Sequence, residues 1–116
     1  LLGYKKNAED YLRSGDLFIL SSKYEGLPNV LIEAQSKGVP IISSDCPTGA
    51  REILLNGKLG DLFPVGDYKK LSFLISKFNS SKKRLLRLSK KSKKYLNRFD
   101  LKTNCLKYKK ILEIYI

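Results

Sequence analysis

Three short apolar runs, separated by segments of helical pattern, constrain the fold of this chain most strongly. The runs are DLFILSS, VPIISSD and LGDLFPVGD, and the first is apolar almost without interruption. Such a run is typical of a strand covered on both faces of a parallel sheet. Before the three runs, the sequence predicts an initial strand, LLGY, and a helix over 7–15. Between the runs it predicts a helix over 29–37 that ends at Gly38 and a short helix that is closed by Gly57. This alternation predicts an α/β fold, a Rossmann-like parallel sheet with flanking helices.

The second half of the chain is helical in pattern. Asp67 is the predicted N-cap of the first of three helices, and Asp100 is that of the last. Their apolar stripes, interpreted as core contacts, are Leu71, Leu74, Ile75 and Phe78; then Leu85, Leu88, Ser92, Tyr95 and Phe99; then Leu101, Cys105, Tyr108, Leu112 and Tyr115. The 116 residues suffice for one domain. We expect a single, truncated domain over 1–116, with an α/β core over 1–66 and a helical part over 67–116.

The positive charge is confined to the second half. The formal net charge is +12, yet residues 1–66 carry seven Lys or Arg against eight Asp or Glu, and residues 67–116 carry sixteen against three. A basic surface of this kind can meet anionic lipid or nucleic acid, and it can equally be a solvated face. No secretory signal and no apolar run of about 20 residues is present in the sequence.

Cysteine and histidine chemistry is restricted. The chain has no His and only two cysteines, Cys46 and Cys105. Neither a Cys/His metal site nor a Cys/His nucleophile pair can therefore be built. We expect two free thiols in a reducing compartment, the cytoplasm, and no bound metal or cofactor.

The segment YEGLPNVLIEA joins the run DLFILSS to the next predicted helix. It lies after the carboxyl end of a strand, where open α/β sheets bind ligands. Gly26 allows close approach of a ligand, and Pro28 suits a first helical turn. The amides of Leu27, Asn29 and Val30 are then expected to point outward at the positive end of the helix, which predicts a phosphate site.

Two carboxylates flank this predicted phosphate site. Glu25 precedes the turn, and Glu33 lies about 6 Å along the helix from Asn29 at a rise of about 1.5 Å per residue. Carboxylates can accept hydrogen bonds from the vicinal hydroxyls of the two sugars of a nucleotide-diphosphate sugar. A second interpretation stays open: Glu25 favours the helix dipole, and Glu33 forms an ion pair with Lys37.

The segment also resembles a known family. Glu25 and Glu33, separated by seven residues inside YEGLPNVLIEA and followed by GVPIISSD and REIL, resemble the E-x7-E motif of retaining glycosyltransferases of GT-B fold, family 4 or group 1. The resemblance covers residues 1 to about 66. It implies a donor site in a C-terminal lobe, where Glu25 is catalytic and contacts the transferred sugar and Glu33 holds the ribose. The donor-binding residues implied are Glu25, Gly26, Leu27, Pro28, Asn29, Val30 and Glu33.

The segment DCPTGAREIL resembles the loop and short helix that flank the donor site in this family. Thr48, Gly49 and Glu52 are secondary candidates, for which a structural cap and a surface helix are the competing interpretation. Lys23 and Arg51 lie near the predicted site but do not match the family's diphosphate clamp, which lies upstream of Leu1. The acceptor-binding domain is also missing, so we expect the isolated chain to be inactive.

The first hypothesis is therefore the donor-binding part of a hexosyltransferase that uses a UDP-linked sugar to extend a glycan or lipid-linked acceptor of the cell envelope. Its basic helices would rest on the inner face of the cytoplasmic membrane. A basic nucleic-acid-binding module explains the charge but leaves EGLPN and both glutamates unexplained, so no nucleic-acid partner is expected. A noncatalytic sugar-nucleotide-binding subunit is the third hypothesis.

Overall fold

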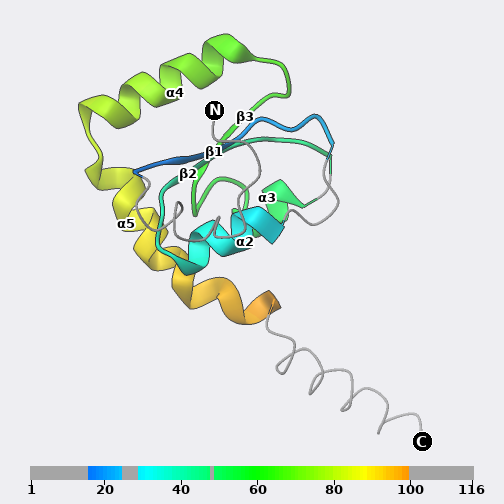
Figure 1. Ribbon diagram of the computed structural model, residues 1–116, viewed down its shortest axis with the longest axis vertical. Helices are drawn as coiled ribbons and strands as arrows, with labels where there is room; N and C mark the ends of the chain where they lie inside the picture. The colour runs from blue at the N-terminus through cyan, green and yellow to red at the C-terminus, as the bar shows by residue number, and fades with distance from the viewer. Residues whose placement is uncertain (1–15, 25–28, 48, 100–116) are drawn as a thin grey trace, which may run out of the picture.

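The computed structural model describes residues 16–24, 29–47 and 49–99. Along the chain these residues form β1 (Phe18–Leu20), α2 (Asn29–Ser36), β2 (Ile41–Ser44), α3 (Ala50–Ile53), β3 (Asp61–Phe63), α4 (Tyr68–Ser80), α5 (Lys83–Ser92) and the 3-10 helix η1 (Lys93–Phe99) (Figure 1). The predicted strand LLGY, the predicted helix over 7–15 and the predicted helix after Asp100 lie outside the described residues.

The strands form a three-stranded parallel sheet in the order β1-β2-β3. Phe18 lies opposite Ile41 in the first pair, and Ile42 lies opposite Asp61 in the second. Because the strands run in one direction, their carboxyl ends share one edge of the sheet. The segments that leave the sheet there are residues 21–24, 45–47 and 64–67. The α/β class with a parallel sheet is thus confirmed.

Two helical layers cover the two faces of β2. Side chains of a strand alternate between faces, and Ile41 accordingly packs among Leu31, Ala34, Ile53 and Leu54 of the α2 and α3 side. Its neighbour Ile42 packs in a second cluster, with Phe63 from β3 and with Leu74, Phe78 and Leu85 from α4 and α5. Figure 1 shows α4 on one side of the sheet and α2 and α3 on the other. The burial of all four β2 residues follows from this arrangement.

The ends of two helices form as the sequence predicts. At Gly38, with φ +70°, the amide of Gly38 donates to Gln35 and the amide of Val39 donates to Ala34, which is the Schellman arrangement. At the start of α4, the Asp67 carboxylate accepts a hydrogen bond of 2.9 Å from the amide of Lys70. Both features depend only on nearby residues.

Four sequence-based expectations need correction. DLFILSS was expected to be covered on both faces, but Ile19 is 38% exposed. The reason is that β1 is the edge strand of the described sheet and α4 packs against β3, at the other edge. Ile75 and Tyr95, both expected in core stripes, are each 37% exposed; on α4 only the face that carries Leu74 and Phe78 meets the core. The helix predicted to close at Gly57 ends at Ile53, since the next turn contains residues with positive φ. The helix predicted to continue to Phe99 changes to 3-10 geometry at Lys93.

The α5 helix is attached to the sheet through an ion pair and through Leu85, which packs in the second cluster with Ile42 and Phe63. The Arg84 guanidinium pairs with the Asp61 carboxylate of β3, and Leu85 is 2% exposed. Beyond α5, η1 contacts α2, and the Lys93 side chain lies beside Gly38. In the part of the chain described, no helix combines the length and the apolar character that crossing a membrane requires.

Gly60 marks a close approach between the turn before β3 and strand β2. A Cβ atom at Gly60 would lie 2.9 Å from the Ile41 carbonyl oxygen and 3.1 Å from Leu54 Cδ2. The first of these is backbone of the buried central strand and cannot move aside. We therefore expect Gly60→Ala to lower the free energy of unfolding by about 1–3 kcal/mol. Urea denaturation followed by circular dichroism measures this value.

Lys58→Ala is the matched control, because Lys58 is exposed two residues earlier in the same turn. We expect a change within about 0.5 kcal/mol for this variant. Equal stability of Gly60→Ala and the natural chain would contradict the close approach.

Candidate functional site

Helix α2 begins at the predicted site. Asn29 is its first residue and is exposed, Val30 is half-buried, and Glu33 is exposed about one turn further on. Leu31 and Ala34 occupy the opposite, buried face. The first amides of a helix have no partner within the helix, and Asn29 and Val30 occupy these positions in α2. The alternative ion pair between Glu33 and Lys37 is not among the ion pairs of the described residues.

The predicted residues Glu25, Gly26, Leu27, Pro28 and Thr48 lie outside the described residues. Their assignment therefore stays a prediction. The structure places only the two ends of this connection, Tyr24 after β1 and Asn29 at the start of α2.

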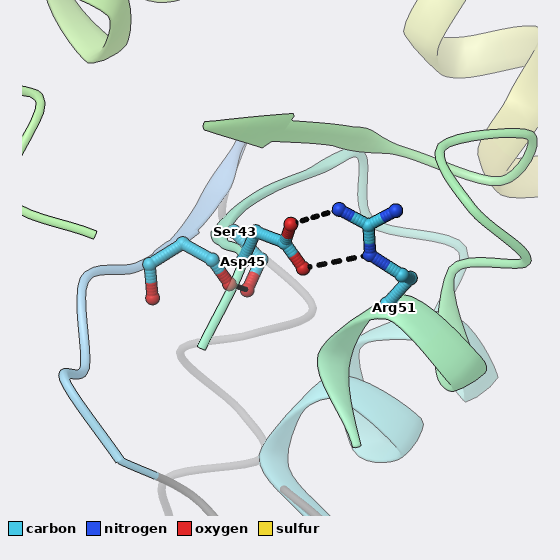
Figure 2. Close-up of polar contacts among 4 residues, drawn as sticks. Ser43, Asp45 and Arg51 are labelled. Carbon is cyan, nitrogen blue, oxygen red and sulfur yellow. Dashed lines mark hydrogen bonds and ion pairs between the residues drawn. The ribbon is translucent and has the colours of Figure 1, made fainter. Parts of the chain in front are cut away.

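An ion pair connects the segment after β2 with α3. Arg51 Nε donates to one carboxylate oxygen of Asp45 at 3.1 Å, and its Nη2 donates to the other, so the pair is bidentate (Figure 2). Hydrogen bonding to Arg51 lowers the pKa of the Asp45 carboxyl below its ordinary value of 3.8, and the charge of Arg51 acts in the same direction against a partial burial that raises it. The same contact raises the pKa of Arg51. The segment between the two residues is thereby held to the helix that follows it.

Two further hydrogen bonds fix the carboxyl end of β2 to its neighbours. Ser44 Oγ donates to the carbonyl oxygen of Ser22 at 2.6 Å, which joins β2 to the segment after β1. The amide of Asp45 donates to the carbonyl oxygen of Phe63 at 2.7 Å, which joins it to the end of β3. The three segments that leave this edge are thus connected through Ser44 and Asp45.

Two open clefts lie along this edge and share Asp45 and Pro47. The first, of about 450 Å³, is lined by Lys23, Tyr24, Asp45, Pro47, Pro64 and Val65, from the ends of all three strands. The second, of about 600 Å³, is lined by Asp45, Cys46, Pro47, Gly49, Arg51, Glu52 and Asn56. Both fall where ligands bind in open α/β sheets.

The structure brings some of the predicted site residues together. Gly49 and Glu52 line the second cleft, whereas Asn29, Val30 and Glu33 line neither of these two clefts. The helices that carry them are neighbours, because Gln35 Nε2 of α2 donates to the carbonyl oxygen of Ile53 in α3 at 3.1 Å. Gly49 is buried and has φ +93°, so a glycine is required directly before α3.

Sequence reasoning missed Asp45 and gave Arg51 no role. The available signal was an acidic residue directly after a buried strand, with an Arg six residues later in a predicted helix. Within the described ranges, no group of three or more Cys, Asp and Glu side chains is placed to hold a metal ion.

Solved structures share this fold. The HepE protein of Anabaena in complex with UDP superposes with a TM-score of 0.85 at 21% identity, over 97% of this chain and 31% of that one. The same protein in complex with UDP-glucose gives a TM-score of 0.83 at 21% identity, over 97% of this chain and 31% of that one. At 21% identity this likeness shows the fold alone, and it agrees with the predicted α/β fold.

Sequence relatives are glycosyltransferases by name. The uncharacterized glycosyltransferase MJ1059 of Methanocaldococcus jannaschii is 54% identical over 54 residues, which are 47% of this chain and 13% of the relative. The lipopolysaccharide 1,6-galactosyltransferase of Salmonella typhimurium is 46% identical over 48 residues, 41% of this chain and 13% of that protein. The chain thus matches only a small part of the length of these relatives. Residues 1–95 match the family Glycosyl transferases group 1, and the chain belongs to that family.

Proposed function

We propose that this chain is the donor-binding part, within the C-terminal lobe, of a retaining glycosyltransferase. In this proposal the parent enzyme transfers a hexose from a UDP-linked sugar to a glycan or lipid-linked acceptor in polysaccharide or cell-envelope synthesis. The observation that carries the proposal is the start of α2, the next described element after β1, with Glu33 exposed one turn along, in a chain of the group 1 family.

The geometry of α2 suits a diphosphate. The first amides of a helix and the helix dipole favour negative charge at this end, where Asn29 and Val30 lie. Glu33 is the fifth residue of α2 and lies about 6 Å along the axis from Asn29. That separation matches the distance from the diphosphate to the ribose hydroxyls. A carboxylate can accept hydrogen bonds from these hydroxyls. Glu33 is accordingly proposed to hold the ribose.

The transfer step is proposed at the other end of the diphosphate. There Glu25 would contact the transferred sugar, and the turn of Gly26, Leu27 and Pro28 would direct amides at the diphosphate. Preorganised amides stabilise the charge that develops on the departing diphosphate, which is the largest contribution the protein can make to such a step. Thr48 belongs to the same proposal as a flanking donor-site residue.

The named relatives support the choice of donor and pathway. HepE of Anabaena has been solved with UDP and with UDP-glucose, and an Escherichia coli relative is a UDP-Gal-dependent galactosyltransferase by name. Others are named for amylovoran and Vi polysaccharide biosynthesis. In the proposal, the acceptor is bound by a separate N-terminal domain, and this chain alone does not catalyse transfer. The buried free thiol of Cys46 suits work in the reducing cytoplasm.

The loop between β2 and α3 lies beside the proposed donor site. The Asp45–Arg51 pair holds this loop at the edge where all three strands end. Both residues are therefore proposed as positioning residues, which keep Gly49 and Glu52 near the donor.

The role of Glu33 can be tested in the 116-residue chain. We expect Glu33→Gln to weaken UDP binding about 10- to 100-fold, because hydrogen bonds to a charged group contribute about 1.5–3 kcal/mol. For a UDP analogue that lacks both ribose hydroxyls, the affinity of Glu33→Gln should equal the affinity of the natural chain. Saturation-transfer NMR titration, which detects weak ligands, measures both affinities.

The matched control is Asp16→Asn, an exposed acid-to-amide change before the opposite end of β1. An equal loss in both variants, or no loss in Glu33→Gln, would contradict the proposed role of Glu33. Absence of any nucleotide binding, together with salt-sensitive binding of DNA, would favour the nucleic-acid hypothesis instead.

The Asp45–Arg51 pair predicts a pH-dependent contribution to stability. Because the folded-state pKa of Asp45 is lowered, its contribution is fully present above the ordinary value of 3.8 and is lost as the pH falls through the folded-state pKa. We expect Arg51→Gln to lower the melting temperature by a constant amount between about pH 5 and 8, and by less and less below about pH 4. Because the Arg51 side chain is exposed, the pair contributes little, so differential scanning fluorimetry must resolve small shifts.

Lys58→Gln is the control for removing one exposed cation. If the difference in melting temperature between Arg51→Gln and the natural chain does not change as the pH falls, protonation of Asp45 is not its cause.

A further inference from the structure

The segment from Tyr68 to Phe99 combines many cations with no anion. It contains twelve Lys or Arg and no Asp or Glu in 32 residues. One of the cations, Arg84, is paired with Asp61 from outside the segment. This charge serves none of the contacts of the donor site, and it is concentrated on α4, α5 and η1.

The outer face of α4 has a defined composition. Leu74 and Phe78 face the core, and one exposed flank of the helix carries Phe73 with its neighbours one turn away, Lys69, Lys70 and Lys77. We call these four residues the outer face of α4. Figure 1 shows α4 along the margin of the molecule, with no other described element beyond it.

Phe73 lies among the lysines of this face and is 57% exposed. Lys70 Nζ lies 5.1 Å from the centre of the Phe73 ring. Further exposed apolar side chains, Tyr68 at 74% and Ile75 at 37%, lie on the same helix. A single exposed ring is common on protein surfaces, but a ring set among lysines is the combination that interfacial helices present to a membrane.

We propose that the outer face of α4 binds the surface of a membrane that contains anionic lipids. The lysines would lie at the anionic headgroups, where each contributes to binding. Phe73 would enter the boundary between headgroups and acyl chains, as aromatic residues of interfacial helices do. Lysine side chains are long enough to keep their charge at the headgroups while the ring enters the boundary.

A nucleic acid is the other polyanion this charge could meet, and the structure favours it less. Single strands are bound in grooves lined by aromatic side chains on which successive bases stack. The outer face of α4 lies on the surface of one helix and carries one aromatic ring, so it offers no series of rings for stacking. Apolar and basic side chains on one face fit a lipid surface better.

The test is co-sedimentation of the 116-residue chain with vesicles. We expect binding to vesicles of equal parts phosphatidylglycerol and phosphatidylcholine, reduced by high salt, and no binding to phosphatidylcholine alone. The double variant Lys69→Gln, Lys77→Gln should bind about 25-fold more weakly, at about fivefold per lysine. Phe73→Ala should bind about tenfold more weakly, from the loss of its buried apolar area. Lys58→Gln removes one cation outside α4 and is the control for charge alone; its binding should decrease by less than the fivefold expected for one lysine of α4.

Phe73→Trp gives a readout that charge alone would not produce. The chain has no Trp, so this variant carries a single reporter, whose fluorescence should shift to the blue and be quenched by lipids brominated in the acyl chain. Lys58→Trp should show neither effect. Circular dichroism confirms that each variant is folded.

The proposal is overturned if anionic vesicles do not bind the chain, or if Lys58→Gln weakens binding as much as the α4 variants do. It is also overturned if the Trp at position 73 is not quenched, or if DNA displaces the chain from vesicles and Phe73→Ala has no effect. These results are independent of UDP binding, because Glu33 lies on α2, which packs with the cluster on the opposite face of the sheet from α4.

Discussion

The burial of β2 between two helical layers is the constraint on which the rest of the structure depends. Ile41 and Ile42 are adjacent in sequence and almost fully buried, yet they pack into two separate clusters. Each fully buried side chain of this size contributes about 1.5–3 kcal/mol. Because the side chains of a strand alternate, a slip of β2 by one residue would move both into the wrong layer. This register also determines which residues reach the carboxyl edge, and Ser44 and Asp45 are placed there by it.

Serine at the end of β2 has a structural consequence that an apolar residue would not have. Ser43 and Ser44 are buried, and their hydroxyl groups donate to carbonyl oxygens, that of Ser44 to the segment after β1. A buried hydroxyl without a partner would destabilise the fold. The Ser43 hydrogen bond stays within β2, whereas that of Ser44 connects two segments at the edge where the clefts lie. The sequence ISSD therefore continues a buried strand and organises the site in the same few residues.

Features that depend on nearby residues could be predicted from the sequence, and features that depend on distant ones could not. The end of α2 at Gly38, the Asp67 cap and the parallel α/β order follow from local patterns, and the structure confirms them. The exposure of Ile19 and Ile75 depends on how far each helical layer extends, which no local pattern contains. The Asp45–Arg51 pair joins residues on two sides of a loop whose path was unknown. The roles of Glu25 and its turn rest on the motif alone, whereas the position of Glu33 also has support from α2.

The two proposed surfaces belong to one continuous framework. Val65 lines the cleft at the ends of the strands, and α4 begins three residues later, capped by Asp67. The far side of α4 is anchored through Leu74 and Phe78 to the same cluster as Ile42. A membrane bound at the outer face of α4 would therefore hold the carboxyl edge of the sheet near the lipid surface. For an enzyme that acts on a lipid-linked acceptor, this placement would keep the donor near the surface in which the acceptor is anchored, and this would favour transfer by proximity.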